Sequence, residues 1–191
     1  MASTKCTKIL SIDVGIKNLS FCVLEASQLQ TTICDWGNLC ITEDNCKKIK
    51  LEELTELIIE SLTRKFDDVF SADVVLIENQ PSLKNGMMKT VSVIIFTYFN
   101  MLKYQYGNIN QVKFISATNK LKCLRVHTLQ NQNTSTYKDR KKLSIQLACL
   151  YINHFCPDRL TWFQQQSKKD DFADSLNQAI YYIEYVLKLQ V

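Results

Sequence analysis

Hydrophobic and polar positions alternate at the start of the chain in the pattern of β-strands. The run from Lys8 to Val14, KILSIDV, is aliphatic with small polar residues between the apolar ones, which predicts a buried strand. A short turn follows at 15–18, and LSFCVLEA at 19–26 predicts a second strand. β-Branched residues and a tryptophan over 31–41 predict a third strand, so two consecutive hairpins open the fold.

The pattern then changes to a helical period and back again. Over 51–70, leucine and isoleucine fall on one face and glutamate on the other, which predicts an amphipathic helix. The next run, ADVVLIE at 72–78, is short and apolar, as expected of a strand that is buried on both faces. We therefore expect this strand to lie in the middle of a sheet.

Helical spacing dominates the rest of the chain. We expect a fifth strand, VKFIS, at 112–116, and three helices at 87–106, 139–155 and 170–189. The segment 127–136 has almost no apolar residues and is expected to form an exposed, mobile loop. Hairpin-connected strands followed by crossover helices predict a mixed α/β fold.

The helix predicted over 87–106 carries apolar residues on several faces, among them Val93, Phe96 and Met101. One face is expected to cover the sheet. The other face either forms the seam of a dimer or is buried within the monomer.

Composition fits a globular protein, and we expect one domain over 1–191 with a core of ordinary size. The first residues lack the pattern of a signal peptide, and the apolar runs are shorter than the roughly 18 residues of a membrane-spanning helix. The cysteines contain no CxxC pair, so we expect them to behave as small core hydrophobes in a reducing compartment. They are Cys6, Cys22, Cys34, Cys40, Cys46, Cys123, Cys149 and Cys156.

Charge is distributed unevenly along the chain, although the net charge is only +4. Residues 79–157 carry eleven Lys or Arg against a single acid, Asp139, whereas residues 1–78 carry eight against thirteen. A basic block of this kind is typical of nucleic-acid binders. The alternative is a solvated surface that balances the acidic first third across the fold.

Three groups of acids stand out from the other carboxylates. Asp13 ends the first strand, Glu78 ends the buried strand VVLIE, and Asp170, Asp171 and Asp174 open the last helix. Each has a structural explanation, because solvent begins at a strand end and acids stabilise a helix N-terminus. Taken together they point to a site, since neighbouring strand ends meet and residues three apart share a helix face.

Clustered carboxylates repel one another, and divalent cations bound between them relieve this repulsion. Mg²⁺ prefers hard oxygen ligands and keeps waters that substrate phosphates replace. Two such ions about 4 Å apart stabilise the attacking and leaving oxygens of a displacement at phosphorus. A carboxylate cluster beside a basic block therefore indicates phosphodiester hydrolysis.

Three stretches resemble the acidic motifs of RuvC-type resolvases within the ribonuclease H-like superfamily. They are SIDVGIKNLSFCVLE, VVLIENQP and KKDDFADSLNQA, in the order and approximate spacing of that family. The chain length, the cysteine-rich composition and the long N-terminal hairpins are most similar to the poxvirus branch. The resemblance implies an α/β ribonuclease H-like fold, with a mixed five-stranded sheet and helices on both faces.

The resemblance also implies a function. Such a protein is a homodimer that makes paired symmetric nicks in four-way (Holliday) junctions and branched viral DNA, with water as the nucleophile. It uses Mg²⁺, for which Mn²⁺ substitutes, with two ions per active site. By motif, Asp13, Glu78, Asp171 and Asp174 are the catalytic metal ligands. Asp170 competes with Asp171, which is preferred because DFADSL aligns with the D-x-x-D-A/S-L pattern of the family.

The family keeps a lysine near the scissile phosphate, which the match assigns to Lys142 in YKDRKKLSIQ, with Lys138, Arg140 and Lys141 as alternatives. Backbone phosphates are expected to meet basic side chains that give affinity without sequence specificity. These are Lys84, Lys89, Lys120, Lys122, Arg125, Lys138, Arg140 and Lys141. Tyr137 is a candidate for stacking at the branch point.

Other functions fit less well. An actin-like ATPase duplicates the fold and needs about twice this length. A nuclease acting on RNA–DNA hybrids, or a transposase-like enzyme, has a similar fold and similar carboxylates. A purely structural DNA-binding protein has no use for acids that weaken DNA binding. The resemblance places the protein in the cytoplasm of an infected host cell, without membrane association.

Overall fold

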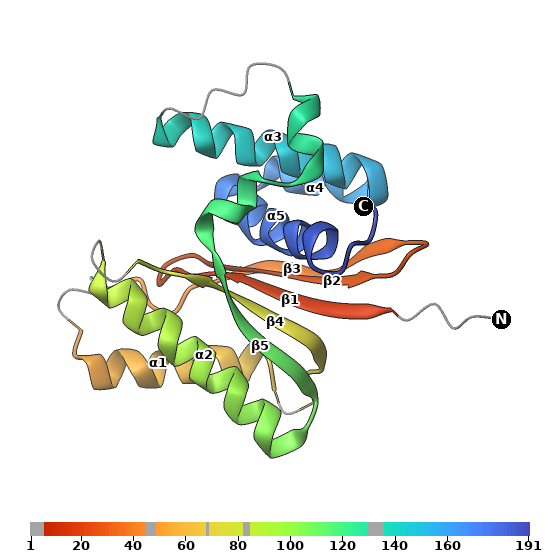
Figure 1. The fold of residues 1–191 in the computed structure, drawn as a ribbon. Helices are drawn as coiled ribbons and strands as arrows, with labels where there is room; N and C mark the ends of the chain where they lie inside the picture. Colours follow the sequence, from red (N-terminus) through yellow and green to blue (C-terminus); the bar gives the residue numbers. More distant parts are fainter. Residues whose placement is uncertain (1–5, 45–48, 68, 82–84, 130–135) are drawn as a thin grey trace.

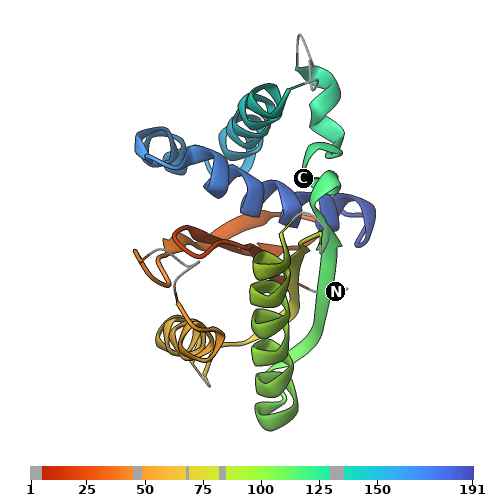
Figure 2. The same cartoon turned by 90° about the vertical axis from the view of Figure 1, so that its left-hand side faces the viewer.

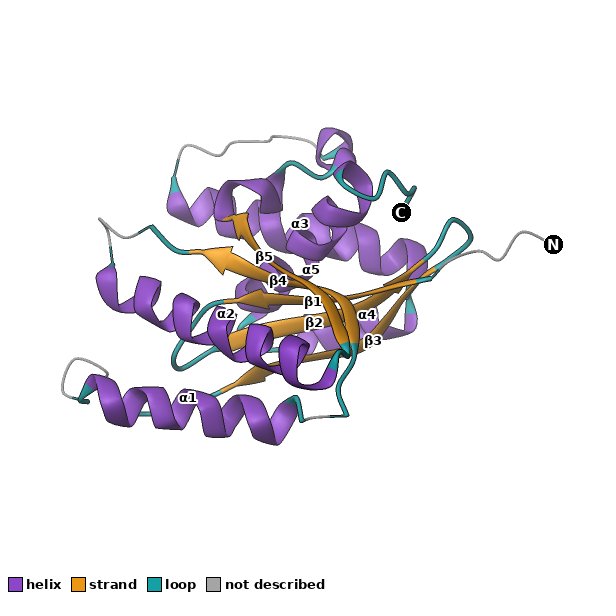
Figure 3. Cartoon of the chain, turned by 60° about the horizontal axis from the view of Figure 1, so that its bottom comes forward, coloured by secondary structure: helices purple, strands orange, loops and turns teal. Residues whose placement is uncertain are grey.

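The computed structural model describes residues 6–44, 49–67, 69–81, 85–129 and 136–191. Five strands form one sheet in the order β3-β2-β1-β4-β5 (Figure 1). The strands are β1 (Thr7–Asp13), β2 (Leu19–Ala26), β3 (Thr31–Leu39), β4 (Ala72–Asn79) and β5 (Ile109–Ser116). The first three are joined as antiparallel hairpins, and β4 and β5 continue the sheet parallel to β1 (Figure 3).

Helices cover both faces of this sheet, as predicted (Figures 1 and 2). One face is covered by α1 (Leu51–Lys65) and α2 (Gly86–Tyr106). The opposite face is covered by α5 (Lys169–Tyr185), and α3 (Tyr137–Phe155) and α4 (Asp158–Gln165) pack against α5. Two short 3₁₀ helices, η1 (Ala117–Leu121) and η2 (Leu124–Thr128), connect β5 to this second layer.

Strand alternation divides the core into two layers, because successive side chains point to opposite faces of a sheet. In β1, Leu10 and Ile12 belong to the core under α1 and α2, whereas Ile9 belongs to the core under α3 and α5. Asp13 therefore follows Ile9 onto the α5 side of the sheet. The direction of this carboxylate is set by the same alternation that builds the core.

The structure shows which faces of α2 are buried and which are exposed. Val91, Ile95 and Phe99 are fully buried against the sheet. On the outer side, Val93 is 43% exposed and Met101 62% exposed, so this apolar face is not buried within the monomer. A shallow groove between α1 and α2 contains both of these side chains.

The predicted elements all form, with shifted ends and some additions. The first long helix ends at Lys65 rather than at residue 70, and β5 begins at Ile109 rather than at residue 112. The early residues of β5 were missed because polar residues alternate there, as the open edge of a sheet allows. Helix α4 was not predicted, since its eight residues are mixed in polarity. Residues 130–135 of the predicted loop lie outside the described part of the chain.

The cysteine prediction is only partly confirmed. Cys22 and Cys123 are buried, but Cys6, Cys34 and Cys40 are exposed, so these three are not core residues. They lie at strand ends or on the open edge strand β3, where apolar runs reach the surface. Cys46 lies outside the described residues. Among the helices that the structure describes, none is long and apolar enough to cross a membrane.

Candidate active site

The parallel pairing of β1 and β4 brings two acids together at the carboxyl end of the sheet. Ile12 pairs with Ile77, so Asp13 and Glu78 follow at neighbouring positions. Glu78 is 7% exposed. Asp13 is the last residue of β1 and Glu78 the second-last of β4, and the earlier residues of both strands are core. Both carboxylates are therefore held at the boundary between core and solvent.

Helix α5 brings the remaining acids to the same place. Buried Gln178 donates hydrogen bonds to Ser11 Oγ (3.0 Å) and to the carbonyl oxygen of Ile12 (3.2 Å). These bonds fix the helix across the end of β1. Its first turns, with Asp170, Asp171 and Asp174, therefore lie over the strand ends.

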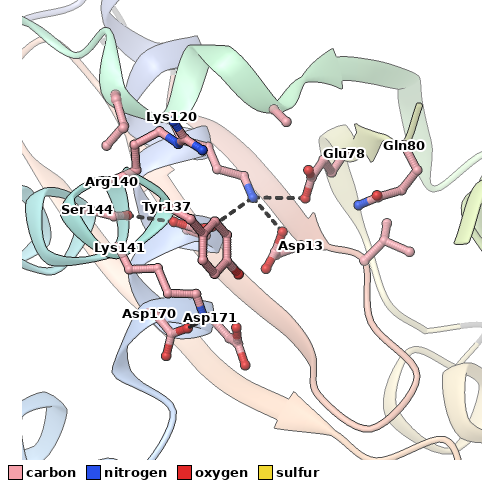
Figure 4. A pocket seen from close by; sticks show the side chains of 14 residues that line it. Asp13, Glu78, Gln80, Lys120, Tyr137, Arg140, Lys141, Ser144, Asp170 and Asp171 are labelled. Carbon is pink, nitrogen blue, oxygen red and sulfur yellow. Dashed lines mark hydrogen bonds and ion pairs between the residues drawn. The ribbon is translucent and has the colours of Figure 1, made fainter. Parts of the chain in front are cut away.

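A single pocket contains all five of these carboxylates (Figure 4). Three basic side chains, Lys120, Arg140 and Lys141, line it as well, together with Tyr137 and Ser144. The acids come from β1, β4 and α5, and the other side chains come from η1 and α3. Sequence segments that lie far apart thus meet at one edge of the sheet.

Lys120 lies at the centre of the carboxylates. Its ammonium donates to Asp13 Oδ1 at 2.5 Å, to Glu78 Oε2 at 2.8 Å and to Asp174 Oδ2 at 3.1 Å. The residue is only 6% exposed. The sequence interpretation placed Lys120 among residues that meet backbone phosphates on the surface, whereas the structure places it inside the site. Apolar Leu121 and Cys123 nearby indicate that this turn packs on the core, but the burial of Lys120 itself follows from the packing of α5 against the turn.

Burial changes the ionisation of the site. Burial, opposed by Lys120 and supported by Glu78, raises the pKa of Asp13 to about 8. Burial also acts to raise the pKa of Glu78, but hydrogen bonds from Asp13 and Lys120 outweigh it and lower that pKa. The two carboxylates therefore differ in the direction of their pKa shifts, and Asp13 retains a proton more readily than Glu78.

The two helix acids are affected in the same direction. Burial, together with the neighbouring charges of Asp170 and Asp13, raises the pKa of Asp171 to about 6. Burial also raises the pKa of Asp174, against the opposing effect of Lys120. Both shifts mean that additional positive charge near these carboxylates is stabilising.

The chemistry of the donors fits a divalent cation. Among the described residues, no group of three or more His, Cys, Asp or Glu side chains is positioned as it stands to hold a metal ion. The carboxylates instead surround the Lys120 ammonium, which shows that they accept a cation between them. Five acids against three bases line the pocket, all five with hard oxygen atoms of the kind that Mg²⁺ prefers.

Ser144 and Asn177 support Asp174, and sequence reasoning missed both. Ser144 Oγ donates to Asp174 Oδ1 at 2.6 Å. Asn177 Nδ2 donates to Ser144 Oγ at 3.0 Å and to its carbonyl oxygen at 2.9 Å. Since the hydroxyl oxygen accepts from Asn177, its hydrogen is directed at Asp174. The sequence signal is a polar residue at a buried position of each helix.

The basic residues at the start of α3 differ in whether their side chains line the pocket. Arg140 and Lys141 line the pocket, and Lys141 forms an ion pair with Asp170. Lys142 and Lys138 are not among the residues that line it. Lys141 is thus the α3 lysine that pairs with a carboxylate of the pocket, and the assignment of Lys142 by motif stays a prediction.

The other basic candidates lie outside the pocket. Lys89 donates to Asn79 Oδ1 at 2.7 Å, and Lys122 donates to Asn119 Oδ1 at 3.2 Å. The guanidinium of Arg125 donates to the carbonyl oxygen of Val191. Lys84 lies outside the described residues. Tyr137 is 67% exposed at the mouth of the pocket.

Solved structures of other proteins share this architecture. The Holliday junction resolvase of fowlpox virus has a TM-score of 0.60 at 18% identity, covering 94% of this chain and 99% of its own. The yeast mitochondrial Holliday junction resolvase Ydc2 gives 0.60 at 20% identity, covering 95% and 81%. Thermus thermophilus RuvC in complex with a Holliday junction substrate gives 0.56 at 13%, covering 95% and 96%. The predicted ribonuclease H-like fold of the RuvC type is thereby confirmed.

Sequence relatives are viral. The uncharacterized protein L451 of Acanthamoeba polyphaga mimivirus is 30% identical over 84% of this chain, which spans only 41% of the length of that relative. Residues 7–188 match the family described as poxvirus A22 protein, so the match includes β1, β4, α3 and α5. The chain belongs to the poxvirus A22 protein family.

Proposed function

We propose that the chain is a metal-dependent endonuclease that resolves four-way DNA junctions by paired nicks, with water as the nucleophile. One observation carries this proposal: five carboxylates meet at the ends of β1 and β4 and the start of α5, on a RuvC-type fold. The solved resolvases with the same fold, one of them in complex with a Holliday junction, support the choice of substrate.

Asp13, Glu78, Asp171 and Asp174 are the proposed ligands of Mg²⁺, or of Mn²⁺ in its place, at two positions per site. Bound there, the ions supply Lewis-acid polarisation of the scissile phosphate and lower the pKa of the attacking water. Asp171 and Asp174 lie three residues apart on one helix face, so both can turn toward the strand ends. Ser144 holds Asp174 in this direction through a 2.6 Å hydrogen bond.

Lys120 is the lysine that we propose to act at the scissile phosphate. Its ammonium lies within 3.1 Å of three candidate ligand carboxylates, so it can stabilise negative charge that develops on a phosphate oxygen beside them. Lys142 lies outside the pocket lining and is less suited to this role. Arg140, Lys141 and Tyr137 at the mouth are proposed to hold the DNA strand.

Two symmetric nicks require two active sites, which a homodimer supplies. The exposed apolar side of α2, with Val93 and Met101, is a surface that such a dimer can bury. We propose that 1–191 forms one nuclease domain and acts on branched viral DNA in the cytoplasm of the infected cell.

Cleavage of labelled substrates tests this proposal. A four-way junction, a linear duplex and an RNA–DNA hybrid are incubated with the protein in Mg²⁺ or in EDTA, beside Asp13→Asn. Paired nicks on the junction, absent in EDTA and in the variant, are expected. Cleavage of the hybrid alone moves the substrate to RNA, and no cleavage of any substrate contradicts the nuclease assignment.

A further inference from the structure

The two lysines of the pocket differ in how firmly they are held. The side chain of Lys120 is 7% exposed and donates to three carboxylates. The side chain of Lys141 is 40% exposed and forms an ion pair with Asp170. Lys120 is therefore built into the floor of the site, whereas the ammonium of Lys141 remains reachable from solvent.

The Lys141–Asp170 pair connects the beginnings of two helices. Lys141 lies in the first turns of α3, and Asp170 lies in the first turn of α5. The Lys141 ammonium also lies 5.0 Å from the centre of the Tyr137 ring, at the distance of a cation–π contact. Figure 4 shows Lys141 extending to Asp170 beside the Tyr137 ring. The pair thus lies at the mouth of the pocket, where a DNA strand has to pass.

Asp170 and Asp171 are adjacent in sequence but have different surroundings. Successive helix residues are about 100° apart, so their side chains leave the helix in different directions. Asp171 shares a face with Asp174, and burial, followed by the charges of Asp170 and Asp13, raises its pKa. Asp170 is hydrogen-bonded to Lys141. Asp171 therefore belongs to the proposed metal site, whereas the carboxylate of Asp170 is bound to the Lys141 ammonium.

The balance of charge makes this separation relevant to DNA. Five acids and three bases line the pocket, so a polyanion that enters it meets net negative charge. A lysine ammonium is a compact charge on a flexible stem and can exchange one anionic oxygen for another. A DNA phosphate offers the same kind of acceptor that Asp170 now provides.

We propose that Asp170 occupies the phosphate-binding position of Lys141, and that a backbone phosphate of the substrate displaces the Asp170 carboxylate when a DNA strand enters the pocket. This inference rests on the proposed function. Asp170 then competes with the substrate for the Lys141 ammonium and is not a metal ligand. It weakens the binding of a strand that engages Lys141, because the internal ion pair has to be broken first.

A double-mutant cycle on DNA affinity tests the displacement. Binding of a fluorescent four-way junction is measured by anisotropy in EDTA for the parent, Asp170→Asn, Lys141→Ala and the double variant. We expect Asp170→Asn to bind roughly three- to fivefold more tightly, the range of an exposed ion pair. We expect this gain to vanish when Lys141 is alanine. Removing Lys141 should also lower the salt dependence of binding by about one unit of slope.

Asp158→Asn is the matched control, because it removes one exposed acid from the first turn of a helix outside the pocket. An equal gain in DNA affinity for Asp158→Asn, or a gain for Asp170→Asn that persists when Lys141 is alanine, overturns the displacement. In either case, general repulsion between a carboxylate and the DNA phosphates explains the gain. Absence of any gain overturns it too. Mn²⁺ affinity, measured by calorimetry, should be unchanged in Asp170→Asn, and its loss would identify Asp170 as a ligand. A parent that binds no DNA at all contradicts the proposed function itself.

Discussion

The two faces of the sheet are built from the same strands but differ in what they bury. Under α1 and α2 the described core is aliphatic and aromatic, with Phe66 and Phe99 at its centre. Under α3 and α5 the core also encloses polar side chains that are bonded to one another or to the backbone. These are Ser11, Ser20, Ser144, Ser175, Asn177, Gln178 and Glu184.

This difference follows from where the acids lie. Asp13 points to the α5 side, and the charged pocket requires hydrogen-bonding partners beneath it, because buried polar groups without partners are costly. Asn177 and Gln178 supply donors, although their own amide oxygens lack hydrogen-bond partners within the described residues. On the α1–α2 face, the buried hydroxyl of Ser92 bonds within its own helix, to the carbonyl oxygen of Lys89. Both faces contribute to the core, but the chemistry is expected to depend on the α5 side alone.

The largest expected effect is a loss of stability from the apolar face. Phe99 is fully buried and contacts the rings of Phe66, Phe70 and Tyr98. Phe99→Ala should lower the free energy of unfolding by about 3 to 5 kcal/mol, measured by urea denaturation. Cleavage per folded molecule should be retained. A more than tenfold loss of cleavage in protein that is still folded would show that the two faces are not separable.

Asp174→Asn should retain stability and lose cleavage, which is the opposite of the result expected for Phe99→Ala. Asparagine keeps the size of the side chain and an oxygen that accepts from Ser144, so the fold should be retained. Loss of a carboxylate from the proposed metal site should slow single-turnover cleavage by roughly a thousandfold. Asp158→Asn serves as the control for the same chemical change outside the pocket. Full activity of Asp174→Asn would remove this residue from the site.

The pH dependence of stability sharpens the comparison. Burial raises the pKa of Asp13 from its usual range near 4 to about 8 in the folded protein. In EDTA, the folded state is therefore penalised increasingly as pH rises between these values, because ionisation is easier in the unfolded chain. The amide introduced by Asp13→Asn resembles the protonated acid and escapes this penalty.

Thermal unfolding from pH 4 to pH 9 checks the sign. The melting temperature of Asp13→Asn relative to the parent should increase with pH through this window and level off above about pH 8. A difference that stays constant with pH would show that the carboxyl group has the same pKa in both states.

The smallest effect compares one buried serine on each face. Ser144 donates to Asp174, whereas Ser92 in α2 donates to the carbonyl oxygen of Lys89 at 2.7 Å. Ser144→Ala should weaken Mn²⁺ binding about tenfold, since residues that orient metal ligands contribute on that scale. Ser92→Ala should leave Mn²⁺ binding unchanged. Calorimetric titration of both variants provides the comparison, and equal affinities would deny Ser144 its positioning role.

Sequence patterns predicted much of this arrangement because local physics determines it. Strand alternation and the acids at strand ends indicated Asp13 and Glu78, and helix spacing indicated Asp171 and Asp174. The strand order adds the contact between the ends of β1 and β4. These features depend on periods of two and 3.6 residues, which a single sequence displays.

The inward position of Lys120 and the choice between Lys141 and Lys142 were beyond the sequence. Lys120 lies in a 3₁₀ turn after an edge strand, and only the packing of α5 against that turn buries it. Lys141 and Lys142 are adjacent, and which of them faces the pocket depends on how α3 packs across α5. Both outcomes depend on contacts between elements far apart in the chain.

Lys120 among the carboxylates is consistent with two states of the site: a metal centre, or a closed network of internal ion pairs. Calorimetric titration of the parent and of Asp13→Asn with Mn²⁺ distinguishes them. Our account predicts saturable binding by the parent that weakens at least about tenfold in the variant. Absence of binding by the parent, or equal binding by both proteins, would contradict the proposal that these carboxylates form a metal site.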